Sequence, residues 1–235
     1  MDKKILCVIP ARAGSKGIKN KNLSKIGTES LVEISIKQAI DVGEFTEIFV
    51  STDSDEIFEL AKKNGLKQPF KRKPELAEDH VHASEVIFDS IKRYEELGEE
   101  FTDVVMLLPT SPLRSASDIK KALSLFLQSK SSSLVSVFDT KKNLINFRFI
   151  KGEKLIPVAS DSNLNSNRQG LEKIYCVNGD IFISTIESFL RNKSFHTNDC
   201  IPYIMKAGST VDINSQEDLN EARELAKKDE TNKNT

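Results

Sequence analysis

The chain has 235 residues, of which 38% are hydrophobic, enough for one globular domain with its own core. Its 34 basic and 35 acidic residues nearly cancel, so no overall field draws it toward nucleic acid or an anionic membrane. No apolar run reaches the roughly 18 residues of a membrane span, and Pro10 and Arg12 follow the first lysines too closely for a signal peptide. We therefore expect a cytoplasmic protein. Its three cysteines form no CxxC pair and suggest neither a disulfide framework nor a zinc site.

The first half of the chain alternates short β-branched runs with helical stretches. Ile5–Ile9 has the composition of a buried strand, and Leu31–Val42 has the apolar spacing of a helix behind the favourable N-cap Ser30. This alternation predicts an α/β sandwich, in which βαβ units place helices over a mostly parallel sheet. Further strands are expected at Glu47–Ser51, Asp103–Leu108 and Leu134–Phe138, and further helices at Ser54–Asn64, Ser84–Leu97 and Ser117–Gln128.

The pattern changes after Phe138 to a polar, irregular stretch, which predicts an insertion at about residues 140–172. A strand at Cys176–Ile183 then resumes the core. It is followed by a weaker strand at Ile201–Met205 and an amphipathic helix at Ser215–Lys228. Residues 229–235 are polar and are expected to form a frayed tail. We treat residues 1–235 as a single domain.

The first strand ends in a basic loop that contains two glycines, with the sequence PARAGSKGIKNKN. Glycine permits close approach of a ligand to the backbone, Ser15 can donate a hydrogen bond, and Arg12, Lys16 and Lys21 can neutralise phosphate oxygens. The loop has neither Walker A nor GxGxxG spacing. A solvated surface loop is the alternative for such a charge run. Its position at the carboxyl end of a strand favours a triphosphate site.

The segment IPARAGSKGIKNKNL resembles the N-terminal motif of the CMP-sialic acid synthetases, the acylneuraminate cytidylyltransferase family that includes the legionaminic and pseudaminic acid enzymes. Four later segments agree with that family in order: Arg72 with PELA, LPTSPLR at 108–114, VNGDIFI at 177–183 and TVDIN at 210–214. The resemblance covers about residues 3–220. It implies one cytidylyltransferase domain with a three-layer, Rossmann-like nucleotidyltransferase sandwich and a predominantly parallel mixed sheet.

The resemblance also implies roles for particular residues. Asn22 and Arg72 would contact cytosine. Asp212 and Asn214 would hold the Mg²⁺ or Mn²⁺ that bridges the phosphates, although the family motif is DxD and Asn214 replaces the second acid. Ala11, Arg12, Ser15, Lys16 and Lys21 would bind the triphosphate, with Arg12, Lys16, Lys21 and Asp212 supplying most of the catalysis.

For the sugar, Arg168, followed by Gln169 as a second substrate-binding residue, resembles the family's arginine that pairs with the substrate carboxylate, which suits a bidentate arginine. Asn178 and Phe182 match the strand that lines the sugar pocket. Leu108 stands where the family usually has glutamine, and an apolar residue there favours a sugar with fewer hydroxyls, such as legionaminic or pseudaminic acid.

The implied function is transfer of CMP from CTP to the anomeric hydroxyl of an acidic nine-carbon sugar, with release of pyrophosphate. The insertion at 140–172 corresponds to the family's dimerisation element, which implies a homodimer. Two alternatives stay open. One is the related synthetase for the eight-carbon sugar Kdo, and the other is a non-catalytic nucleotide-sugar binding protein, because Asn214 and Leu108 depart from the active pattern.

Overall fold

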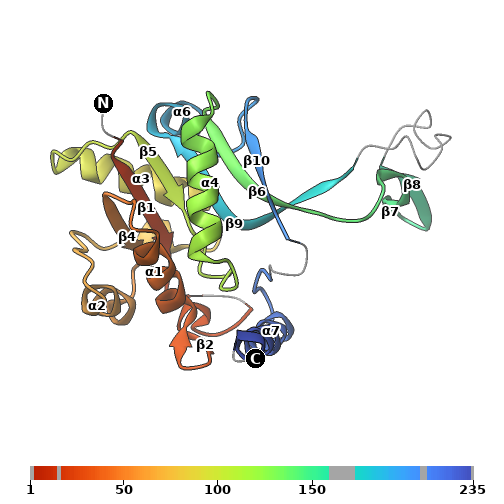
Figure 1. The fold of residues 1–235 in the computed structure, drawn as a ribbon, viewed down its shortest axis with the longest axis horizontal. Helices are drawn as coiled ribbons and strands as arrows, with labels where there is room; N and C mark the ends of the chain where they lie inside the picture. The colour runs from red at the N-terminus through yellow and green to blue at the C-terminus, as the bar shows by residue number, and fades with distance from the viewer. Residues whose placement is uncertain (1–2, 15–16, 159–172, 207–210, 234–235) are drawn as a thin grey trace.

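The computed structural model describes residues 3–14, 17–158, 173–206 and 211–233 and has a central six-stranded sheet (Figure 1). The strand order is β10-β6-β9-β5-β1-β4. Only β9 runs antiparallel to its neighbours in this sheet, so the predicted mostly parallel mixed sheet is confirmed. The strands are β1 (Ile5–Pro10), β4 (Glu47–Ser51), β5 (Asp103–Met106), β6 (Ser133–Asp139), β9 (Tyr175–Thr185) and β10 (Ile201–Met205).

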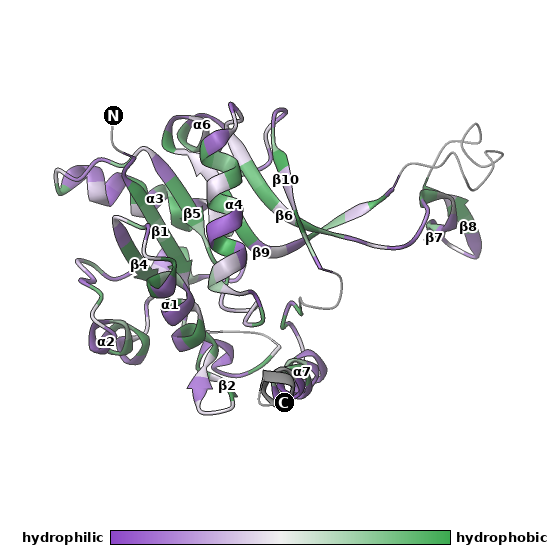
Figure 2. Ribbon diagram, in the orientation of Figure 1, coloured by the Kyte–Doolittle hydropathy of each residue, from purple (hydrophilic) through white to green (hydrophobic). Residues whose placement is uncertain are grey.

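Helices cover both faces of this sheet, which gives the three layers expected. Side chains of β1 alternate between the two faces, with Cys7 in one core cluster and Leu6 in the other. Figure 2 shows the hydrophobic residues concentrated in the central strands. The first face is covered by α1 (Leu31–Val42), α2 (Asp55–Lys63) and α4 (Ala116–Gln128), and the second by α3 (Ala83–Glu96) and α6 (Ile186–Asn192).

Local sequence signals explain where these elements begin and end. Helix α1 begins after Ser30, whose side chain accepts a hydrogen bond from the Glu33 amide while the Glu33 carboxylate accepts one from the Ser30 amide. This is a capping box, so the predicted N-cap is confirmed. Strand β5 was predicted to reach Leu108 but ends at Met106, because the chain turns ahead of Pro109. Leu108 therefore lies in a turn and not in a strand.

The insertion contains regular structure that its polar sequence did not predict. β7 (Arg148–Lys151) and β8 (Lys154–Pro157) form an antiparallel hairpin after the short 3-10 helix η3 (Leu144–Asn146). Figure 1 shows this hairpin far from the sheet, at the end of the extended chain that leaves β6 and returns through β9. We call residues 144–158 the arm.

The last helix packs below the sheet on the short hairpin of β2 (Lys25–Ile26) and β3 (Glu29–Ser30). Ile213 and Leu219 form a small buried cluster there with Ile26 and Leu31. Helix α7 runs from Gln216 to Lys233 and so includes residues 229–233 of the predicted tail, where no Gly or Pro interrupts the helix. None of the helices in the described ranges is long and apolar enough to cross a membrane.

Candidate active site

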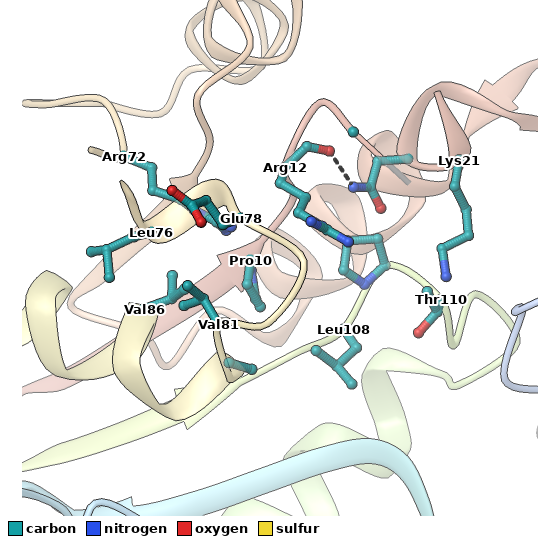
Figure 3. Close-up of a pocket in the computed structure, with 14 residues that line it drawn as sticks. Pro10, Arg12, Lys21, Arg72, Leu76, Glu78, Val81, Val86, Leu108 and Thr110 are labelled. Atoms are coloured by element: carbon teal, nitrogen blue, oxygen red, sulfur yellow. Dashed lines mark hydrogen bonds between the residues drawn. The ribbon is translucent and has the colours of Figure 1, made fainter. Parts of the chain in front are cut away.

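A cavity of about 190 Å³ opens at the carboxyl ends of β1 and β5 (Figure 3). In open α/β sheets ligands bind at this edge, outside the carboxyl ends of the strands. Figure 3 shows Arg12 and Lys21 projecting into the same space above Leu108 and Thr110. The cavity is lined by Pro10, Arg12, Gly14, Lys21, Asn22, Arg72, Leu76, Glu78, Val81, Ala83, Val86, Leu108, Pro109 and Thr110.

The basic loop is tied to the segment that follows the 3-10 helix η2 (Pro74–Ala77). The guanidinium of Arg12 is paired with the Asp79 carboxylate at 2.6 Å and donates to the Ala77 carbonyl at 3.0 Å. Nδ2 of Asn22 donates to the carbonyl of Arg12 at 2.9 Å. These contacts hold Arg12 across the cavity mouth. A phosphate that binds Arg12 there would have to replace the Asp79 carboxylate as its anionic partner.

Lys21 links the same loop to the C-terminal acidic segment. Its Nζ donates a hydrogen bond of 2.8 Å to the carbonyl of Ile213. Burial lowers the pKa of Lys21, while the nearby Asp212 carboxylate acts in the opposite direction. Gly17 also lies against this segment, because a Cβ built on it would clash with the Asn214 carbonyl oxygen. The loop therefore reaches the predicted metal segment only because residue 17 has no side chain.

Arg72 is buried in the cavity wall, with 6% of its surface exposed. Its Nη2 donates to the Ser51 carbonyl at 2.7 Å and its Nε to the Ser51 hydroxyl at 3.2 Å. Burial lowers its pKa to about 10, against the attraction of Asp53. Ala11 is also fully buried, and its amide donates to the same Ser51 carbonyl, so it can offer a ligand only its backbone.

The predicted metal segment precedes α7 and is exposed at Asp212 and Asn214. Nδ2 of Asn214 donates to Oδ2 of Asp212 at 2.8 Å, so the amide nitrogen faces the carboxylate. Asp218 accepts hydrogen bonds from the amides of Asn214 and Ser215, and these bonds lower its pKa. In the described part of the chain no three His, Cys, Asp or Glu side chains converge as metal ligands.

The predicted sugar residues are only partly described. Asn178 is 7% exposed and its amide is already engaged, accepting from the Ser136 hydroxyl at 2.5 Å and donating to Asp180 at 3.1 Å. Phe182 packs in the core against Phe195, with ring centroids 5.6 Å apart. Neither residue lines the cavity, whereas Leu108 does. Ser15, Lys16, Arg168 and Gln169 lie outside the described residues.

Two features near the cavity escaped the sequence analysis. Asp79, the ion-pair partner of Arg12, follows the PELA segment closely. An acidic residue next to a segment of the nucleotide site was the sequence signal that could have predicted this ion pair. Arg114 ends the LPTSPLR segment and is 2% exposed. Its burial has no local signal, because two of its partners, Ser35 and Asp180, come from segments distant in the sequence.

Comparison with known proteins adds to this geometry. The cytidylyltransferase family matches residues 6–175. Post-translational flagellin modification protein B of Campylobacter coli is 35% identical over 92% of both chains. The CMP-N,N'-diacetyllegionaminic acid synthase of Campylobacter jejuni is 36% identical, also over 92% of each. The N-acylneuraminate cytidylyltransferase of Streptococcus agalactiae serotype V is 34% identical over 92% of this chain, which spans about half, 52%, of that protein.

The fold has solved counterparts. The structure of CMP:2-keto-3-deoxy-manno-octonic acid synthetase complexed with CTP superposes with a TM-score of 0.70 and covers 97% of this chain and all of the other. The two sequences are 16% identical, so this likeness establishes the fold alone.

Proposed function

This chain belongs to the cytidylyltransferase family, and we propose that it transfers CMP from CTP to the anomeric hydroxyl of a nonulosonic acid, releasing pyrophosphate. One observation carries the proposal: Arg12 and Lys21 converge on one cavity at the carboxyl edge of the sheet, beside the buried Arg72. The names of two relatives specify N-acylneuraminate and N,N'-diacetyllegionaminic acid, and both compounds are acidic nine-carbon sugars. A cytoplasmic location belongs to this proposal.

In the proposed reaction the anomeric hydroxyl releases its proton to water as its oxygen forms a bond to the α-phosphorus of CTP. The bond between that phosphorus and the oxygen bridging to the β-phosphate breaks, and pyrophosphate leaves with the electron pair. Charge neutralisation and alignment dominate such transfers. Arg12 and Lys21 supply positive charge beside the phosphates, with Lys16 and the Ser15 hydroxyl in the same loop. Arg12 exchanges its Asp79 partner for a phosphate oxygen, one anionic partner for another.

The cytosine is assigned to the part of the cavity beside Asn22 and Arg72. Cytosine offers a carbonyl and ring-nitrogen acceptors to an arginine or amide donor. The Ser51 contacts hold the Arg72 guanidinium in one orientation, as recognition of a single base edge requires. Uracil presents a different edge and leaves a buried donor or acceptor unpaired, which favours CTP over UTP.

Mg²⁺ or Mn²⁺ is proposed as the cofactor, and the donor set fits such an ion. Mg²⁺ is commonly held by one or two carboxylates together with substrate phosphates. The exposed Asp212 carboxylate provides the charge, while Asn214 orients it through the 2.8 Å hydrogen bond. When bound, the ion would neutralise the charge that develops on the phosphates. Lys21 adds a second positive charge close to Asp212, which keeps the phosphates near that segment.

The sugar is assigned to the side of the cavity lined by Leu108, with Arg168 pairing with its carboxylate and Gln169 as a further substrate-binding residue. The apolar Leu108 favours a deoxy sugar of the legionaminic or pseudaminic type. A homodimer formed through the arm belongs to the same proposal. Its support is the exposure of large apolar side chains on the arm, which leaves them in water unless a partner covers them.

Pyrophosphate release tests the proposal directly. The protein with Mg²⁺ and an acidic nine-carbon sugar should release pyrophosphate from CTP and at least about a hundred-fold more slowly from UTP. Turnover with Kdo alone would favour the eight-carbon alternative. Tight CTP binding without pyrophosphate release from any acidic sugar would favour the non-catalytic binding protein.

A further inference from the structure

A buried polar cluster lies behind the turn of residues 108–111, whose first three residues line the cavity. Arg114 is 2% exposed and Asp180 is completely buried. Charged side chains are seldom buried to this degree unless they are paired. Arg114 contacts the backbone carbonyl of Asp180, and neither side chain lines the cavity, so the two buried charges need an explanation other than substrate contact.

The guanidinium of Arg114 joins three elements of the fold. Its Nη1 donates to the carbonyl of Leu108 at 2.7 Å and to the carbonyl of Asp180 at 3.1 Å. Its Nη2 donates to the hydroxyl of Ser35 in α1 at 2.9 Å. One planar, multidentate group therefore ties the turn to strand β9 and to helix α1.

Asp180 follows a kink in β9 that lies against the same turn. Gly179 has a φ of 79°, in the region that favours glycine, and the register with β6 shifts between Val135 and Val137. A Cβ built on Gly179 would lie 3.8 Å from Leu108 Cδ1 and 3.9 Å from the Ser111 hydroxyl. The kink and the turn therefore pack on each other.

The cluster is not fully satisfied by hydrogen bonds. Oδ2 of Asp180 accepts from Asn178 at 3.1 Å, but Oδ1 of Asp180, Nε of Arg114 and Oγ of Ser111 have no hydrogen-bond partner within the described ranges. The Ser111 hydroxyl is close enough to lower the pKa of Asp180 but misses the geometry of a hydrogen bond. Such an arrangement costs folding stability, and costly buried groups are a feature of functional sites.

The turn is hydrogen-bonded to the C-terminal acidic segment. The carbonyl of Thr110 accepts a hydrogen bond of 2.9 Å from the amide of Ile213, the residue after Asp212. A shift of the turn would therefore displace both the Leu108 wall and the backbone that carries the Asp212 carboxylate.

We propose that Arg114 and Asp180 form a positioning unit, which holds the turn of residues 108–111 against the kink of β9 and so fixes the sugar-facing wall and the Asp212 segment. The inference rests on the proposed function, which it extends to two residues that touch no substrate. Because the phosphate-binding cations lie in a different loop, loss of this unit should lower kcat more than it weakens the affinity for CTP.

Hydrogen exchange tests the positioning independently of activity. Asp180→Asn keeps the side-chain shape, removes the charge and replaces one acceptor oxygen by a donor, and Arg114→Lys keeps the charge and loses the planar fork. In both variants the amides of Ser111 and Ile213 should exchange at least about ten-fold faster, while β1 amides keep their protection. Asp103→Asn is the matched control. Asp103 is equally buried but lies at the opposite end of β5, paired with Lys3, and its loss should leave both amides unchanged.

Steady-state kinetics tests the consequence. We expect kcat with the acidic sugar to fall at least about ten-fold in Asp180→Asn, with the Kd for CTP within about three-fold of wild type and kcat unchanged in Asp103→Asn. Wild-type exchange at Ser111 and Ile213 together with wild-type kcat in Asp180→Asn would overturn the inference. If the wild-type protein turns over no acidic sugar, the proposed function fails, and the exchange rates alone decide the positioning unit.

Discussion

Nζ of Lys21 donates a hydrogen bond of 2.8 Å to the carbonyl oxygen of Ile213, although the two residues are 192 positions apart. The contact joins the basic loop after β1 to the acidic segment before α7. It brings the cation proposed for phosphate and the carboxylate proposed for the metal to one edge of the sheet. The charge of Asp212 acts on Lys21 strongly enough to oppose the effect of burial on its pKa.

Lys21→Ala should weaken CTP binding roughly ten-fold or more, because the loss of one charge-assisted phosphate contact costs about 1.5 to 3 kcal/mol. Titration calorimetry measures the change. Lys19→Ala is the matched control, since Lys19 lies in the same loop but is exposed and does not line the cavity, so its affinity should stay within about two-fold. Equal affinities in both variants would remove Lys21 from the site.

Gly17→Ala should lower turnover at least about ten-fold, because the new methyl group would meet the Asn214 carbonyl and push the loop away from Asp212. Gly14→Ala introduces a methyl group into open space, so its melting temperature should match that of wild type. Pyrophosphate release and thermal unfolding of the two variants check this. Wild-type turnover in Gly17→Ala would show that this close approach is not needed.

The sequence predicted the layers of the fold more completely than the site. Long periodic segments such as Leu31–Val42 carry their own caps and apolar faces, and the structure confirms them. The hairpin of the arm was missed, since strands of four residues with both faces exposed have no core against which to alternate. Arg114 and Asp180 were missed for another reason. They meet across 66 residues, and only tertiary structure shows that contact.

The stability that Asp180 contributes should depend on pH, and Asp180→Asn should remove that dependence. Burial raises the pKa of Asp180 from 3.8 to about 6, so the folded state binds this proton more tightly than the unfolded chain. Stability contributed at this site therefore falls as the pH rises from about 4 to 6 and stays reduced above that range. In urea unfolding the wild type should lose about 1 to 3 kcal/mol more stability than Asp180→Asn between pH 4 and pH 8. The same change with pH in both proteins would contradict this.

The arm should carry the dimer contact. Ile150 and Leu155 are paired in register on the hairpin and are 77% and 68% exposed. Light scattering should give a dimer at micromolar concentration for the wild type and a monomer for the double variant Ile150→Lys, Leu155→Lys, with the same thermal stability of the core. Substitution of Lys151 and Lys154 by Gln in the same hairpin is the control and should leave the dimer intact. A wild-type monomer would exclude this assignment.

Asp212→Ala should abolish turnover while CTP binding to the basic loop stays largely intact, since the role proposed for the carboxylate is to hold the metal. Asn214→Asp adds a negative charge beside Asp212 and should lower the Mg²⁺ concentration needed for half-maximal activity. The parent protein should accordingly need high Mg²⁺ or prefer Mn²⁺. Magnesium titrations of the three proteins test this. Full activity of Asp212→Ala at saturating Mg²⁺ would show that the metal does not depend on this residue.

The most direct test of the whole account is mass spectrometry of the product formed from CTP in a mixture of acidic sugars. The mixture should contain sialic, legionaminic and pseudaminic acids together with Kdo, each at the same concentration, with Mg²⁺ present. The account predicts a CMP-linked nine-carbon sugar, formed with one equivalent of pyrophosphate and enriched in a deoxy sugar of the legionaminic or pseudaminic type. CMP-Kdo as the main product, or CTP bound but unconsumed with every sugar, would contradict it.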